Sequence, residues 1–80
     1  MTEEQLLSLF TQLLQNLLAD DTIVLTYETT RDDVPDWDSF NYVNFIVAVE
    51  MELGIKFKVA DVESFMTVGN IVDNAKVLLG

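Results

Sequence analysis

The segment DWDSFNYVNFIVAVEMELG, residues 36–54, contains the start, the body and the end of a predicted helix. Pro35 disfavours helical backbone in the residue before it, so the helix begins beyond this point. Asp38 is the expected N-cap, Ser39 opens the helix, and Gly54 ends it. A hydroxyl in the first turn of a helix lies beside free backbone N–H groups, so a phosphate on Ser39 would be well accommodated. Serine is also a common cap, and the local pattern alone leaves that alternative open.

The helix expected at 39–53 carries two apolar stripes. At about 100° per residue, the conventional core-facing stripe consists of Tyr42, Phe45, Ile46, Val49 and Leu53. The second stripe lies beside Ser39 and consists of Phe40, Val43, Val47 and Met51. In a bundle this small one face of a helix meets the other helices, so the second stripe is either covered by the preceding loop or exposed for a partner. The alternative is a central helix that is buried all round.

The rest of the chain predicts two more long helices. The first runs from about Glu3 to Leu18 and starts with the capping-box spacing of Thr2 and Gln5. The last begins after Thr67 and carries apolar residues at helical intervals.

Between these helices the sequence predicts a long loop and a short helix. A loop of roughly 18 residues follows the first helix, which is unusual in a small domain. Its β-branched stretch at 22–27 has no strand to pair with, so we expect an extended segment laid over the core. A short helical turn is expected at 61–65. The predicted fold is one domain, 1–80, all-α: an antiparallel bundle of three principal helices and one short helix, with a long loop between the first two.

The composition excludes several classes of function. Fourteen acidic and four basic residues give a formal charge of −10, so nucleic acid and anionic membranes are poor partners. The chain has no histidine and no cysteine, and so lacks the usual general base, the commonest zinc ligand and a thiol nucleophile. No apolar run approaches a membrane span. We expect a cytoplasmic, monomeric protein that is not an enzyme and that docks with basic patches on other proteins.

Two features near Ser39 have competing interpretations. The acidic cluster of Asp32, Asp33, Asp36 and Asp38 lacks the glycine and glutamate spacing of a calcium loop, so we expect a solvated loop and no metal site. Trp37 is either an anchor for a partner or a loop aromatic folded onto the core.

The spacing of residues from Ser39 onward resembles the acyl carrier protein family. The resemblance covers essentially the whole chain, because length, acidity and predicted helix order also agree. It is carried by Asp38-Ser39-Phe40, Val43, Phe45, Ile46, Ala48, Val49, Glu50, Leu53, Gly54, Ile55, Phe57 and Thr67-Val68.

This resemblance implies a function without catalysis. Ser39 would be esterified with 4'-phosphopantetheine, donated from coenzyme A by a phosphopantetheinyl transferase, and the arm would hold acyl groups as thioesters. Partner enzymes would belong to fatty-acid, polyketide or related biosynthesis. The alternatives are an unmodified acidic protein-interaction module that docks with basic partners, or a carrier of aminoacyl or peptidyl groups.

The family also implies two groups of site residues. Partner recognition would fall on Asp36, Asp38, Phe40, Val43, Val47 and Glu50. Where the family often has acidic residues in this helix, Asn41 and Asn44 stand instead, so recognition is expected to depend more on apolar contacts. The acyl pocket would be lined by Val49, Phe57, Val62, Phe65, Val68 and Ile71. Phe57 and Phe65 are bulky for such positions, so we expect a shallow cavity in the unloaded protein.

Overall fold

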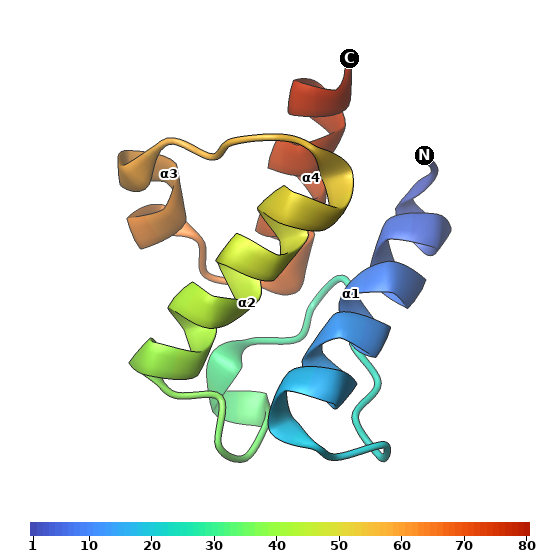
Figure 1. Cartoon of the computed structure of the whole chain (residues 1–80), viewed down its shortest axis with the longest axis vertical. Coiled ribbons are helices and arrows are strands. Elements are labelled where there is room, and N and C mark those ends of the chain that lie inside the picture. The colour runs from blue at the N-terminus through green and yellow to red at the C-terminus, as the bar shows by residue number, and fades with distance from the viewer.

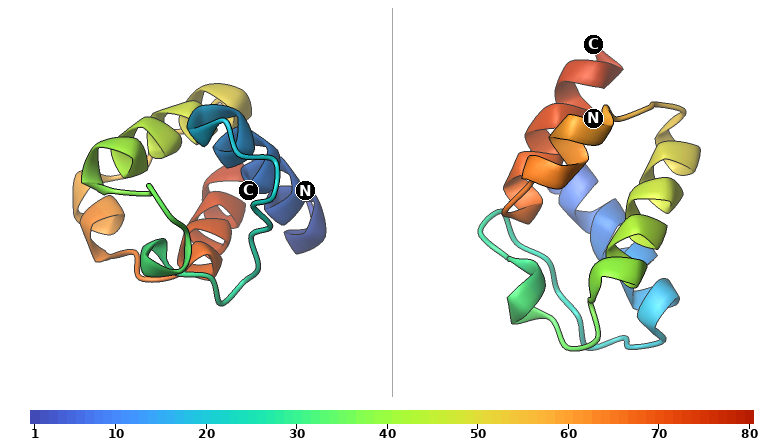
Figure 2. Two further views of the ribbon diagram at one scale, coloured as in Figure 1. Left: turned by 90° about the horizontal axis from the view of Figure 1, so that it is seen from below. Right: turned by 90° about the vertical axis from the view of Figure 1, so that its left-hand side faces the viewer.

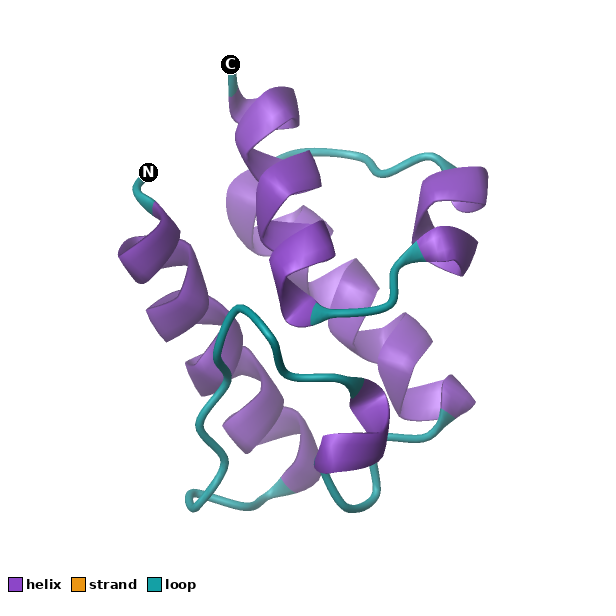
Figure 3. Cartoon of the chain, turned by 180° about the vertical axis from the view of Figure 1, so that it is seen from behind, coloured by secondary structure: helices purple, strands orange, loops and turns teal.

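The computed structural model describes every residue from 1 to 80, and it is all-helical. It contains α1 (Glu3–Leu18), the 3₁₀ turn η1 (Arg31–Asp33), α2 (Ser39–Leu53), α3 (Val59–Ser64) and α4 (Val68–Leu79), and no strand (Figures 1 and 3). This confirms the predicted fold class.

Two short elements differ from the sequence prediction. α3 occupies Val59–Ser64 rather than 61–65, and Lys58 precedes it in extended backbone without a side-chain cap hydrogen bond. No local signal therefore marks where α3 begins. The turn η1 was not predicted, because a single 3₁₀ turn has no apolar periodicity to reveal it.

The ends of the long helices follow local capping chemistry, as predicted. At α1 the Gln5 N–H donates to Thr2 Oγ1 at 3.1 Å and the Thr2 N–H donates to Gln5 Oε1 at 2.9 Å. At α4 the Asn70 N–H donates to Thr67 Oγ1 at 3.2 Å. Gly54 ends α2 with φ of 66°, a left-handed conformation that glycine adopts without steric cost.

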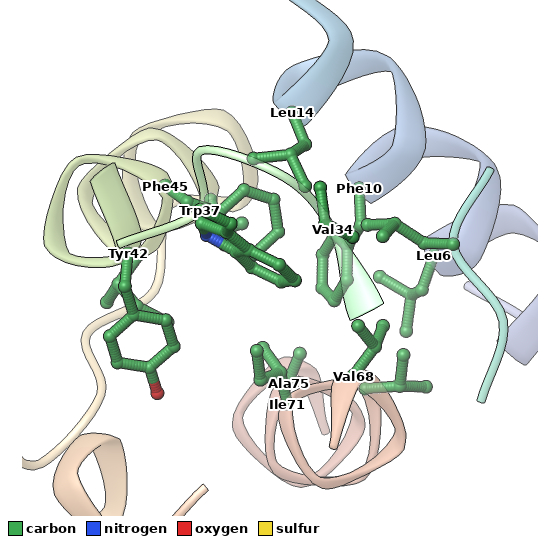
Figure 4. Packing of buried hydrophobic residues seen from close by; sticks show 14 of the residues in the cluster. Leu6, Phe10, Leu14, Val34, Trp37, Tyr42, Phe45, Val68, Ile71 and Ala75 are labelled. Atoms are coloured by element: carbon green, nitrogen blue, oxygen red, sulfur yellow. The ribbon is translucent and has the colours of Figure 1, made fainter. Parts of the chain in front are cut away.

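The helices enclose one core. α1 runs opposite to α2 and α4, so both chain ends lie at one end of the molecule and the start of α2 lies at the other (Figure 1). α1 packs against both α2 and α4. Phe10 of α1 meets Phe45 of α2 edge to face, with ring centroids 5.7 Å apart. Figure 4 shows these rings packed with residues of α4 and the long loop. The largest fully buried side chains are Leu6, Phe10, Leu14, Phe45, Val49, Val68, Ile71 and Val72.

The long loop between α1 and α2 covers one side of this core (Figure 2). It buries four apolar side chains, Ile23, Leu25, Val34 and Trp37. Backbone groups of the loop are held by α1, since the Leu25 N–H donates to Thr11 Oγ1 at 3.0 Å and Gln15 Nε2 donates to the Ile23 carbonyl at 2.7 Å. The β-branched stretch is thus an extended loop over the core, as predicted.

The middle of the loop also binds the start of α4. The N–H groups of Val68 and Gly69 donate to the carbonyls of Thr29 and Tyr27, each at 2.8 Å. These N–H groups have no partner within their own helix, so the loop satisfies them. The approach is close: a Cβ on Gly69 would lie 2.5 Å from two ring carbons of Tyr27 and 2.7 Å from its carbonyl oxygen. The Tyr27 hydroxyl additionally donates to Asp73 on α4.

Candidate functional site

A tight turn over residues 34–37 immediately precedes α2. The Trp37 N–H donates to the Val34 carbonyl at 3.3 Å, which closes a turn over Pro35 and Asp36. Pro35 presets φ at the first central position, and Asp36 has φ of 69° at the second, as a type II turn requires. Asp tolerates this left-handed conformation better than most residues. Asn41 Nδ2 donates to the Asp36 carbonyl at 2.9 Å and so fastens the turn to α2.

Asp38, and not Ser39, caps α2. Its carboxylate accepts the Asn41 N–H at 2.8 Å, and its backbone is extended, with φ of −85° and ψ of −176°. Ser39 is the first helical residue and its side chain is exposed. None of the hydrogen bonds in the structure uses the Ser39 hydroxyl or the N–H groups of Ser39 and Phe40. The site therefore presents a hydroxyl that makes no hydrogen bond, beside two backbone N–H groups that can donate to an anion.

Replacing the cap should cost stability. We expect Asp38→Ala to lower the free energy of unfolding by about 1 kcal/mol, because the Asn41 N–H loses its acceptor. Urea unfolding of the purified variant measures this. Asp32→Ala removes an exposed carboxylate of the same loop and should change stability by less than about 0.5 kcal/mol. Equal losses in the two variants would show that Asp38 does not stabilise the helix.

The second apolar stripe of α2 is exposed. Its exposed fractions are 74% at Phe40, 55% at Val43, 45% at Val47 and 80% at Met51. The alternative of a helix buried all round is therefore wrong. The stripe begins next to Ser39, and three of the predicted recognition residues lie on it.

The three acidic residues predicted for recognition lie near opposite ends of α2. Asp36 and Asp38 are exposed beside Ser39. Glu50 is half-buried near the other end of α2, and its carboxylate accepts the Phe57 N–H at 2.7 Å. Glu50 thus holds the segment between α2 and α3, a contact that helical spacing could not reveal.

The predicted pocket residues are divided between two spaces. A groove of about 370 Å³ between α2 and α3 includes Phe57 and Val62; it is lined by Val43, Ile46, Val47, Glu50, Lys56, Phe57, Val59, Val62 and Glu63. A small cavity of about 10 Å³ includes Phe65, Val68 and Ile71; its remaining lining residues are Thr29, Arg31, Trp37, Tyr42, Met66 and Thr67. Val49 is fully buried and lines neither space.

Tyr42 lines the cavity and is bonded to a residue that lines the groove. Its hydroxyl donates to the Val62 carbonyl at 2.7 Å, which ties α2 to α3. The Arg31 guanidinium carbon lies 4.6 Å from the centre of its ring, a cation–π contact. Burial raises the pKa of the Tyr42 phenol, and the positive charge of Arg31 partly opposes this rise. The sequence carried one signal for this role, since a tyrosine on a core-facing stripe needs a partner for its hydroxyl.

The tie between Tyr42 and Val62 should be sensitive to alkaline pH. A phenol whose pKa is raised by folding adds stability below the unfolded-state pKa, and this contribution is lost as pH rises through the folded-state pKa. We expect Tyr42→Phe to cost about 1 kcal/mol at neutral pH and to lose less stability on going to alkaline pH than the wild type. Tyr27→Phe is the matched comparison, because the pKa of Tyr27 is also raised, chiefly by its hydrogen bond to Asp73. Unfolding curves across alkaline pH measure both, and an unchanged alkaline slope in Tyr42→Phe would contradict the expectation.

Two further observations concern clusters of potential metal ligands and the length of apolar helices. No three His, Cys, Asp or Glu side chains lie close enough together to hold a metal ion. None of the helices combines the length and the apolar character needed to cross a membrane.

Trp37, for which the sequence left two interpretations, is folded into the core with 5% of its surface exposed.

Comparison with known proteins gave a match among solved structures. The solution NMR structure of a holo acyl carrier protein from Geobacter metallireducens is 34% identical to this chain and superposes with a TM-score of 0.84. The match covers 91% of this chain and 84% of that one. Searches against protein-family models and against curated proteins found no match.

Proposed function

Because the chain belongs to the acyl carrier protein family, we propose that it carries acyl groups as thioesters on a 4'-phosphopantetheine arm esterified to Ser39. One observation supports Ser39 as the attachment site of the arm. Ser39 is an exposed helical hydroxyl with no hydrogen bond, because Asp38 supplies the cap.

The residues around Ser39 fit such an arm. The N–H groups of Ser39 and Phe40 would donate to the phosphate, and the positive end of α2 favours its charge. The carboxylates of Asp36 and Asp38 would repel that charge, so the arm should project away from the turn. When attached, the arm supplies a thiol, which this chain cannot provide because it has no cysteine.

The proposed role is transport rather than catalysis. The partners would be a phosphopantetheinyl transferase and acyl-loading and acyl-processing enzymes with basic patches, which complement the charge of −10. They would dock on Asp36, Asp38 and the exposed stripe that starts at Phe40, with Val43 and Val47 in the contact and Glu50 at its far side. Asn41 and Asn44 remove charge from this helix face, so the contact should be more apolar than electrostatic. We infer a cytoplasmic monomer that serves a dedicated fatty-acid, polyketide or related pathway.

The experiment is an intact mass measurement. The purified protein is incubated with coenzyme A and a broad-specificity phosphopantetheinyl transferase, and fragmentation then locates the added mass. We expect one phosphopantetheine per chain, on Ser39. A chain that stays unmodified under conditions that fully modify another carrier protein would instead support the acidic interaction module. Loading of the arm with acyl and with aminoacyl groups by matching enzymes then separates the two carrier types.

A further inference from the structure

Trp37 is a buried hydrogen-bond donor without an acceptor. It is the only tryptophan in the chain, 5% of its surface is exposed, and its indole Nε1 is fully buried with no hydrogen-bond partner. The ring packs edge-on against Phe45, with centroids 5.3 Å apart, and lies 6.3 Å from the ring of Tyr42. In Figure 4 the indole nitrogen lies on the side of the ring toward Tyr42. A buried donor left unpaired loses its hydrogen bonds to water without replacement, so it requires an explanation.

The small cavity described above is lined in part by Trp37. Tyr42, Phe65, Val68 and Ile71 also line it. At about 10 Å³ it is at the lower limit for one water molecule. A buried water also needs two to four polar partners. The hydroxyls of Thr29 and Thr67, which line the same cavity, bond to Thr26 and to the Asn70 N–H, and the Thr67 hydroxyl can still donate one hydrogen bond.

One hydrogen bond links a lining residue of the cavity to a lining residue of the groove between α2 and α3. The groove between α2 and α3 is lined by Val62, whose carbonyl accepts the Tyr42 hydroxyl, and Tyr42 lines the cavity. α3 has only six residues, lacks a side-chain cap and is joined by loops at both ends (Figure 3). Phe65 and Met66, which follow α3, form the outer wall of the cavity, and Met66 is 78% exposed. Displacing α3 would break the hydrogen bond between Tyr42 and Val62 and shift Phe65, and so would open the cavity from the side of the groove.

We propose that Trp37 Nε1 donates a hydrogen bond to an oxygen carried along the acyl chain, which makes the protein selective for keto- or hydroxy-substituted cargo. This inference rests on the proposed carrier function. An apolar chain would pack against Phe65, Val68 and Ile71 but would leave the indole N–H without an acceptor. A chain with an oxygen at the right depth gains the same walls and also satisfies the donor. The thioester oxygen is the competing acceptor, because every loaded chain carries it at the end of the arm.

NMR of the single indole N–H tests this directly in the wild-type protein. The samples are the unmodified protein, the protein with the unloaded arm, one loaded with an alkyl-acyl chain, and a series of keto-acyl chains of that length with the oxygen at successive carbons. Intact mass confirms loading of each sample. We expect the indole proton to move downfield and to exchange more slowly with solvent for at least one keto chain than for the alkyl chain.

Each other result overturns the proposal. An equal shift with alkyl and keto chains would assign the acceptor to the thioester, and a shift with the unloaded arm would assign it to the arm. An indole proton already protected in the unmodified protein and unmoved by loading would show a buried water only. If the mass shows that no arm is attached, the proposed function fails and this inference fails with it.

A variant supplies a second measurement. The keto chain that shifts the indole proton should raise the melting temperature of the wild type more than the alkyl chain does. In Trp37→Phe, which keeps an aromatic ring and removes the donor, this difference should disappear. A difference that persists in Trp37→Phe would contradict the role of the indole even if the variant is less stable overall.

Discussion

Ser39→Ala yields a folded protein that gains no phosphopantetheine mass when it is incubated with coenzyme A and a transferase. The loss should be complete, because no other hydroxyl occupies the first turn of a long helix and remains free of hydrogen bonds. The free energy of unfolding should change by less than about 0.5 kcal/mol, since alanine is a good helix former and Asp38 keeps the cap. Intact mass and urea unfolding of one preparation measure both effects.

The chain offers matched controls for this variant. Its other two serines are Ser8, exposed on α1, and Ser64, exposed at the end of α3. Ser8→Ala and Ser64→Ala should be modified as fully as the wild type. If Ser39→Ala still gained the mass of the arm, the assignment to Ser39 would be wrong, whereas loss of modification in a control would point to damaged docking rather than a missing acceptor.

Gly69→Ala should be among the most destabilising single-methyl changes in the protein. Helix propensity alone predicts a gain of about 1 kcal/mol. The new Cβ would instead fall 2.5 Å from the Tyr27 ring and 2.7 Å from its carbonyl oxygen, and that carbonyl is bonded to the Gly69 N–H. The loop must therefore move, which strains or breaks the two hydrogen bonds it makes to α4. We expect a net loss of about 2–3 kcal/mol, or roughly 10–20 °C in melting temperature.

Calorimetry and a double-mutant cycle check this explanation. In a Tyr27→Ala background the ring is gone and the loop is less constrained, so adding Gly69→Ala should cost less than it does in the wild type. Lys76→Ala, at an exposed position of α4, is the control for a helix substitution without a neighbour. A melting temperature raised by Gly69→Ala would show that propensity outweighs the contact and that the loop is not held there.

The contrast between Gly69 and Ser39 shows what could be predicted from sequence. The caps at Thr2, Asp38 and Thr67 and the stop at Gly54 depend on residues within a few positions, so short-range patterns predicted them correctly. The contact between Gly69 and Tyr27 joins segments 42 positions apart, and no periodicity reports a Cβ that would not fit. The bounds of α3 were missed for a related reason, because this helix depends on tertiary contacts rather than on caps.

The candidate site also combines features that could be predicted from the sequence with features that depend on tertiary packing. The placement of Ser39 and the exposed stripe follow from helix geometry and could be predicted. The division of the pocket residues into a groove and a cavity depends on the ring of Tyr42 and its bond to Val62. The unpaired indole of Trp37 follows from the packing of a loop residue against two rings of α2. Only coordinates reveal such a group, since the sequence favoured a core position for Trp37 at least as much as a surface one but gave no information on its indole N–H.

The positions of the two chain ends have a practical consequence for attaching this protein to other objects. Both ends emerge at the end of the molecule opposite the start of α2 (Figure 1). A bead, an electrode or a fused enzyme joined through a linker at either end would thus sit away from Ser39 and leave its surroundings accessible. The choice of end would also set which helix bears a pulling force first: α1, which contacts both other long helices, or α4, whose start also holds the loop.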